Sequence, residues 1–256
     1  MSEQVLVSKD ERGRLSITMA RPERRNAITV SMYAELADAI ERAANEDDIR
    51  LITIEGAGED FTAGNDLQDF LQEMPQPGSD VDLPVWRFLR AMAKNQVPIV
   101  AAVHGNAVGI GVTMLLHCDL VLVEEGSKLV MPFVDLGLVP EAASSLLVPR
   151  IAGRRAAARY LLLAEPMGAD EALSAGVASH KVGRGELSER LKAVVDALLA
   201  KPAEAMRQTQ ALLRREDTHA ILDRMDLENA HFAERLASDE VKQVLAAFFA
   251  ARAAKA

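Results

Sequence analysis

The stretch PIVAAVHGNAVGIGVTMLLHCDLVLVEE, residues 98–125, contains the pattern that decides the fold. Its two ends, 98–103 and 119–125, are short apolar runs rich in β-branched residues, which is typical of buried strands. Between them lie a glycine-containing loop (104–111) and an apolar segment long enough for a short helix. A strand, a loop, a helix and a second strand in this order predict a mixed α/β core with crossover connections.

The same alternation extends to both sides of this stretch and then stops. Residues 4–20 predict two strands joined by a charged turn, 31–47 a helix opening at Ser31, 49–58 a buried strand and 82–95 an amphipathic helix. Beyond about residue 185 the segments 186–200, 202–216, 221–237 and 239–256 are all helix-like, and no strand pattern intervenes. We therefore expect an α/β core over residues 1–185 and a helical region over residues 186–256, whose amphipathic stripes favour packing on an oligomer partner.

Composition excludes several classes of function. The 256 residues have a net charge of -9, whereas a general nucleic-acid binder would present a basic face. No apolar run approaches the ~20 residues of a membrane span, and neither end resembles a targeting signal. A lone Cys118 cannot form an internal disulfide, and the five histidines lack metal-ligand spacing. We expect a cytoplasmic protein that binds no metal, no nucleic acid and no membrane.

Two glycine-containing turns follow predicted strands, GAGEDFTAGNDLQDF (56–70) and HGNAVGIGV (104–112). The second has the spacing G-x-x-x-G-x-G, which is also found in short-chain dehydrogenases. That family has its motif after the first strand and needs Tyr-x-x-x-Lys, but Tyr33 is followed by Ala37 and Tyr160 by Ala164. A pair of such turns has another use, because each can present one backbone N–H to a shared point. Two N–H groups of this kind form an oxyanion hole for a carbonyl oxygen that becomes negative.

Four segments in order carry a family resemblance: RPERRNAIT (21–29), FTAGNDL (61–67), AAVHGNAVGIGVTMLLHCDLVL (101–122) and LGLVPEAASSLLVPRIAG (136–153). Together they resemble the signatures of the crotonase superfamily, the enoyl-CoA hydratases and isomerases, over about residues 5–182. The resemblance implies a spiral of β-β-α units with a C-terminal helical trimerisation region, in a homotrimer or a dimer of trimers. It also implies an acyl-CoA thioester substrate and no cofactor other than the CoA of that substrate.

By this resemblance, the oxyanion hole consists of the N–H groups of Asn65 and Ile110. Most relatives have glycine at the position of Ile110. Isoleucine keeps the N–H but resists a positive φ, so we expect it to crowd the thioester.

The CoA pocket is also assigned by resemblance. Residues about 69–92 would shape the acyl-chain pocket, and the carbonyl of Ala63 would lie near the adenine amino group. Arg25 either meets the CoA phosphates or is a solvated arginine. The expected pocket residues are Arg25, Thr62, Ala63, Gly64, Asp66 and Leu67.

Glu141 has two interpretations. From the local sequence alone, Pro140 and Glu141 predict the first turn of a helix, where an acid complements the positive end of the helix dipole. By resemblance, Glu141 occupies the position of the lone glutamate in Δ3,Δ2-enoyl-CoA isomerases of the peroxisomal type. There it would take a proton from C2 and return it at C4. We expect the helix N-terminus to lower the pKa of Glu141 and burial to raise it.

The hydratase activity of the same superfamily needs two glutamates, and their positions correspond to Thr113 and Phe133. Neither residue can accept a proton from water, which favours an isomerase with Glu141 as its single base. Asp135 lies two residues from one of these positions. A hydratase that uses Asp135, or a CoA-ester binding protein without catalysis, are the alternatives.

Overall fold

Residues 4–69, 83–214 and 217–253 are described by the structure, which is a computed structural model. Its main sheet has six strands in the order β1-β2-β3-β4-β6-β8, and a smaller sheet pairs β5 with β7. All pairs are parallel except β1–β2, which form the hairpin that residues 4–20 predict. The strands are β1 (Val5–Lys9), β2 (Arg14–Met19), β3 (Leu51–Gly56), β4 (Ile99–Val103), β5 (Asn106–Val108), β6 (Leu120–Glu124), β7 (Lys128–Val130) and β8 (His180–Val182).

Successive turns of the chain repeat one unit: a strand in the main sheet, a shorter one in the second layer, and a helix. Thus β4 is followed by β5 and α4 (Ile110–Thr113), and β6 by β7 and α5 (Ser144–Ala152). The second layer continues through single bridges, Thr62 with Ala107 and Leu129 with Met167. This α/β arrangement confirms the expected spiral of β-β-α units.

Helices α1 (Val30–Asn45) and α3 (Pro84–Lys94) pack together in the main core. Helix α1 begins one residue before the predicted Ser31, because the Thr29 hydroxyl accepts the N–H of Met32 at 3.2 Å and caps it. Its buried face includes Tyr33 and Leu36, and each large side chain buried in this way contributes about 1.5–3 kcal/mol. The remaining helices of the core are η1 (Pro22–Arg24), η2 (Met114–His117), η3 (Val134–Leu136), α6 (Arg154–Leu162) and α7 (Ala169–Ser174).

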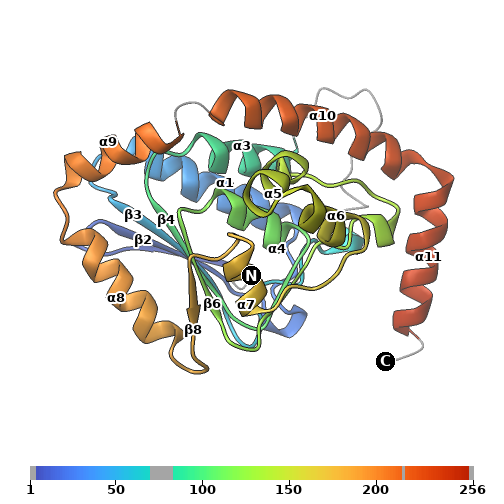
Figure 1. Ribbon diagram of the computed structural model, residues 1–256, viewed down its shortest axis with the longest axis horizontal. Helices are drawn as coiled ribbons and strands as arrows, with labels where there is room; N and C mark the ends of the chain where they lie inside the picture. Colours follow the sequence, from blue (N-terminus) through green and yellow to red (C-terminus); the bar gives the residue numbers. More distant parts are fainter. Residues whose placement is uncertain (1–3, 70–82, 215–216, 254–256) are drawn as a thin grey trace.

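After β8 the described chain is helical, with α8 (Leu187–Leu199), α9 (Ala203–Arg214), α10 (Asp217–Ala237) and α11 (Asp239–Ala253). Helix α8 covers one face of the main sheet through a second apolar cluster that includes Val100, Leu122 and Val195. Figure 1 shows α10 crossing above α3 and α5, which it contacts, while α11 descends at the side. Among the helices in the described ranges, none is long and apolar enough to cross a membrane.

Candidate active site

The two glycine turns lie against each other. Thr62 donates its N–H to the carbonyl of Asn106 at 3.0 Å, and the N–H of Val108 donates to the carbonyl of Thr62 at 3.1 Å. Gly64 has a φ of 85° and no room for a side chain, because an added Cβ would lie 2.6 Å from the Val108 carbonyl oxygen. The residues that follow each turn are therefore held side by side.

Each turn is followed by a backbone N–H without a protein partner. On either side of Asn65, the Gly64 carbonyl and the Asp66 N–H pair with Ile28, so the N–H of Asn65 faces the opposite way. Ile110 is the first residue of α4, where an N–H has no partner within the helix. No hydrogen bond to either N–H occurs within the described part of the chain. Two free donors on adjacent segments are the groups that an oxyanion hole requires.

Ile110 does not need the positive φ that isoleucine resists. The unusual backbone conformation falls on Gly109, with φ 56° and ψ −115°, and Ile110 has ordinary helical geometry. Its side chain is buried in the core, at 2% exposure. A Cβ added to Gly109 would meet no atom within 4 Å, so the space beside this turn is open.

Glu141 is buried, with 4% of its surface exposed. The hydroxyl of Thr113 donates to Oε1 of Glu141, while Oε2 is buried without a hydrogen-bond partner. Thr113 lies one turn after Ile110 on the same helix, and residues three apart share a helix face. Helix α4 thus connects the acid to one of the two free N–H groups.

The interpretation of Glu141 as a first-turn helix acid is wrong. Helix α5 begins only at Ser144, and Glu141 lies before it in an irregular turn. Ala142 and Ala143 both have left-handed backbone conformations, with φ of 58° and 56°. Because of this conformation, the helix begins only after Ala143, and the Glu141 side chain is buried.

Burial raises the pKa of Glu141 to about 8, against a smaller lowering by the Thr113 hydrogen bond and a further increase from the charge of Glu228. The expected lowering by a helix N-terminus does not apply here, because the helix begins three residues later. A carboxyl group with such a pKa is a stronger base when ionised than an exposed glutamate is.

Three residues that sequence reasoning missed complete the site. The buried Tyr33 hydroxyl donates to the side-chain Oδ1 of Asn65. Burial and the charge of Glu141 raise the pKa of Tyr33, so these two side chains act on each other. Nε2 of His117 donates to the Ala142 carbonyl at 2.8 Å, and Glu228 binds the same turn from α10. No local motif marks these residues; their only signal is a polar residue within an apolar helical pattern.

The comparisons with known proteins agree with this geometry. A family model described as "Enoyl-CoA hydratase/isomerase" matches residues 10–255. The chain belongs to this family. It is 32% identical over 253 residues to 1,2-epoxyphenylacetyl-CoA isomerase of Escherichia coli K12, with 96% of each chain covered. A crystal structure of an enoyl-CoA hydratase/isomerase from Pseudoalteromonas atlantica superposes with a TM-score of 0.90 at 39% identity, covering 96% of this chain and 97% of the other.

As an enoyl-CoA hydratase/isomerase family enzyme, the protein uses an acyl-CoA thioester. Of the expected CoA-binding residues, Ala63 and Gly64 form the turn itself, and Leu67 packs against the core. The side chain of Arg25 is 73% exposed and lies 3.7 Å from Asp60. This exposure leaves it free to contact a phosphate group of CoA. For the segment 69–92, residues 70–82 lie outside the described part of the chain.

Two side chains expected to line the CoA pocket have structural partners instead. The hydroxyl of Thr62 is fully buried, donates to the Asn26 carbonyl at 2.6 Å and accepts the N–H of Gly64. Asp66 forms an ion pair with Arg21 at 2.7 Å. Both side chains shape the turn, and the backbone N–H groups of both residues are bonded within the protein as well.

Asp135, the residue of the hydratase alternative, has different surroundings from Phe133. Phe133 precedes the short helix η3, and Asp135 lies within it. Phe133 is buried, whereas Asp135 is exposed to solvent. The two side chains therefore lie in different environments, one in the core and one in solvent.

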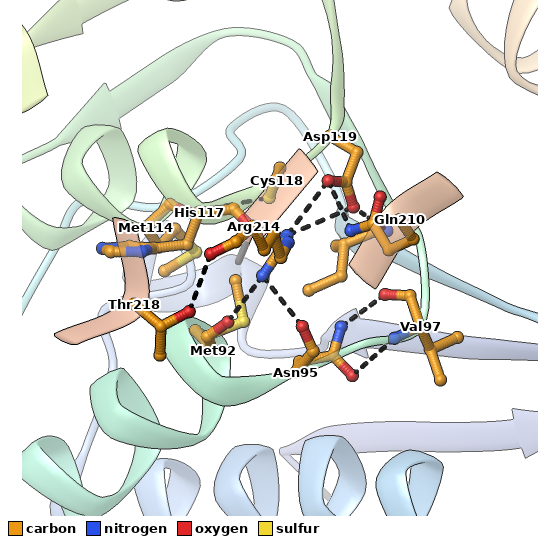
Figure 2. A network of polar contacts seen from close by, with 11 residues as sticks. Met92, Asn95, Val97, Met114, His117, Cys118, Asp119, Gln210, Arg214 and Thr218 are labelled. Atoms are coloured by element: carbon orange, nitrogen blue, oxygen red, sulfur yellow. Dashed lines mark hydrogen bonds and ion pairs between the residues drawn. The ribbon is translucent and has the colours of Figure 1, made fainter. Parts of the chain in front are cut away.

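A second polar cluster fixes α9 of the helical region to the core (Figure 2). Arg214, at the end of α9, donates to the carbonyls of Met92, Asn95 and His117 and forms an ion pair with Asp119 at 3.1 Å. His117 is the residue that holds the Ala142 carbonyl. Burial lowers the pKa of His117 to about 4, so its ring is neutral near pH 7 and its Nε2–H faces Ala142.

Proposed function

We propose that this enzyme shifts the double bond of a 3-enoyl-CoA to give the 2-enoyl isomer, with Glu141 as its single base. One observation carries the proposal. The buried acids of the described residues are Asp60, Glu141 and Glu228, and only Glu141 has a carboxyl oxygen without a partner. Glu141 is hydrogen-bonded to Thr113, and Thr113 lies on α4, whose first residue, Ile110, has a free backbone N–H.

In the proposed reaction, the thioester carbonyl oxygen accepts hydrogen bonds from the N–H groups of Asn65 and Ile110. Oε2 of Glu141 takes a proton from C2, and the electron pair of that C–H bond moves into the carbonyl to form a dienolate. The two N–H groups stabilise its oxygen, each contributing on the order of 3 kcal/mol. The protonated Glu141 then returns the proton at C4, and the double bond ends between C2 and C3.

Two further observations favour isomerisation over hydration. A hydratase must hold and activate water with two acids, and the corresponding positions here are Thr113, already bonded to Glu141, and the buried Phe133. Relatives named as isomerases include enoyl-CoA delta isomerase 2 of the rat, which is 30% identical over 86% of this chain and 57% of its own.

The test is to incubate the protein separately with 3-hexenoyl-CoA and 2-hexenoyl-CoA and to follow each product. We expect isomerisation of the first and no 3-hydroxyacyl-CoA from the second. Glu141→Gln should lose several orders of magnitude in turnover and still bind acyl-CoA, while Asp135→Asn should remain active. Near-normal turnover of Glu141→Gln, or a 3-hydroxyacyl product, contradicts the proposal. Binding without turnover in the unaltered protein indicates a CoA-ester binding protein.

A further inference from the structure

We propose that Glu228, on α10 of the helical region, is a positioning residue for Glu141: it holds the turn that orients the catalytic carboxyl. The inference rests on the proposed role of Glu141 as the base. It assigns part of the catalytic geometry to a helix far along the chain from every motif of the core.

The contacts of Glu228 are specific to the turn. Its Oε2 accepts the N–H of Ala143 at 2.6 Å, and its Oε1 accepts the N–H of Ser145 at 2.9 Å. Only 5% of Glu228 is exposed. A buried carboxylate whose two oxygens accept hydrogen bonds from two nearby backbone N–H groups fixes the orientation of that backbone.

The turn needs such support because it is strained. Left-handed conformations cost roughly 1–2 kcal/mol for each residue with a Cβ, and Ala142 and Ala143 adopt them in succession. His117 binds the carbonyl of Ala142, and the hydroxyl of Ser144 donates to the Glu141 carbonyl at 2.6 Å. Glu228 supplies the acceptors for the N–H groups on the other side. Without them, we expect the turn to relax toward ordinary helix and the Glu141 side chain to rotate.

Burial raises the pKa of Glu228, against the lowering by its hydrogen bonds and by the charge of Arg224. Arg224, on the same helix, donates to the Ser145 hydroxyl at 3.1 Å and is the cation that acts on Glu228. The Thr113 hydroxyl from α4 and the charge of Glu228 act on the Glu141 carboxyl, and the charge of Glu141 acts on the Tyr33 hydroxyl from α1. The charge of Glu228 therefore raises the pKa of Glu141, in addition to the larger effect of burial.

Two substitutions distinguish the effect of the length of the Glu228 side chain from the effect of its charge. Glu228→Gln keeps the length but removes the charge, and its amide group can accept only one of the two N–H bonds. Glu228→Asp keeps the charge, but its side chain is one methylene shorter and cannot reach both donors. The matched control is Glu234→Gln, because Glu234 lies on the same helix and its side chain is 76% exposed.

The measurements are the pH profile of kcat/KM, the separate values of kcat and KM, and an infrared titration of the Glu141 carboxyl in unliganded protein, identified by its loss in Glu141→Gln. In Glu228→Gln we expect both the acidic limb of the profile and the infrared titration to move to lower pH. In both Glu228 variants kcat should fall about ten- to a hundredfold with little change in KM, since the acid is displaced and not the CoA pocket. Glu234→Gln should change neither quantity.

The proposal is overturned if both Glu228 variants have the kcat of the control and Glu228→Gln leaves the Glu141 titration unmoved. If Glu228→Gln does not fold, Glu228→Asp decides, and a normal kcat in that variant overturns the positioning role. Failure of the proposed reaction is a separate result. Even without isomerase activity, the infrared titration reports whether Glu228 controls the protonation of Glu141.

Discussion

Thr113 and Glu141 form a hydrogen bond that leaves the two oxygens of one carboxyl group in different states. Oε1 accepts the Thr113 hydroxyl, whereas Oε2 is buried with no partner. A hydratase of this family would have an acid at position 113; here the same position supplies a donor that orients the remaining acid. In the proposed reaction Glu141 is thus the single base, and its Oε1 is held by a fixed contact.

The rate of isomerisation should depend on pH through Glu141. Burial raises its pKa to about 8, and only the ionised form can take a proton from C2. We therefore expect kcat/KM to rise tenfold per pH unit below this pKa and to level off above it. Steady-state rates between about pH 6 and pH 9 check this, and a flat profile over that range contradicts it.

The same pKa predicts how Glu141 affects stability. In the unfolded chain Glu141 has an ordinary pKa, so the folded state holds its proton more tightly and loses stability as pH rises from about 4.5 to about 8. Glu141→Gln removes this loss. Its melting temperature should therefore exceed that of the unaltered protein at pH 8, and the difference should shrink at pH 5. Calorimetry at both pH values checks this, and a difference independent of pH contradicts it.

Local pattern predicted the secondary elements of the core well, because strands such as Leu51–Gly56 and Ile99–Val103 are continuous apolar runs between clear turns. Asn65, Ile110 and Glu141 were assigned by family resemblance, which short local motifs carry. The start of α5 was misplaced, because the left-handed backbone at Ala142 depends on acceptors and donors from other helices. Glu228 could not be found, since its partners are more than 80 residues away in sequence.

Substitution of Thr113 should shift the pH profile. Thr113→Val keeps the shape but removes the hydroxyl, so the ionised form of Glu141 loses its one hydrogen bond. A hydrogen bond to a charged group is worth about 1.5–3 kcal/mol, which corresponds to a rise of roughly one to two units in the Glu141 pKa. Thr113→Ser retains the donor and is the control. If the acidic limb of the kcat/KM profile lies at the same pH in both variants, the Thr113 hydrogen bond does not change the pKa of Glu141.

Anchoring of α9 should depend on Arg214. Its side chain is only 17% exposed, and Arg214→Met would leave Asp119 and the His117 carbonyl without this partner. Breaking a buried pair of this kind costs about 3–5 kcal/mol. Arg207, on the same helix, is 65% exposed in an ion pair with Glu204, so Arg207→Met should change stability by about 0.5 kcal/mol or less. Urea unfolding measures the loss of stability in both variants. Equal losses in the two variants would contradict the role of Arg214.

Gly109 should matter for catalysis through its backbone alone. Its φ of 56° with ψ of −115° is strained for any residue with a Cβ, although a Cβ there would meet no atom within 4 Å. Gly109→Ala should therefore relax by rotating the peptide that carries the Ile110 N–H, and kcat should fall on the order of a hundredfold, the typical loss for one oxyanion donor.

Gly153, between α5 and α6, has a φ of 80° and equally open surroundings, so Gly153→Ala introduces similar strain away from the site. We expect both variants to lose about 1–3 kcal/mol of stability but only Gly109→Ala to lose kcat. Equal kcat values in the two variants would show that the Ile110 N–H does not bind the thioester oxygen.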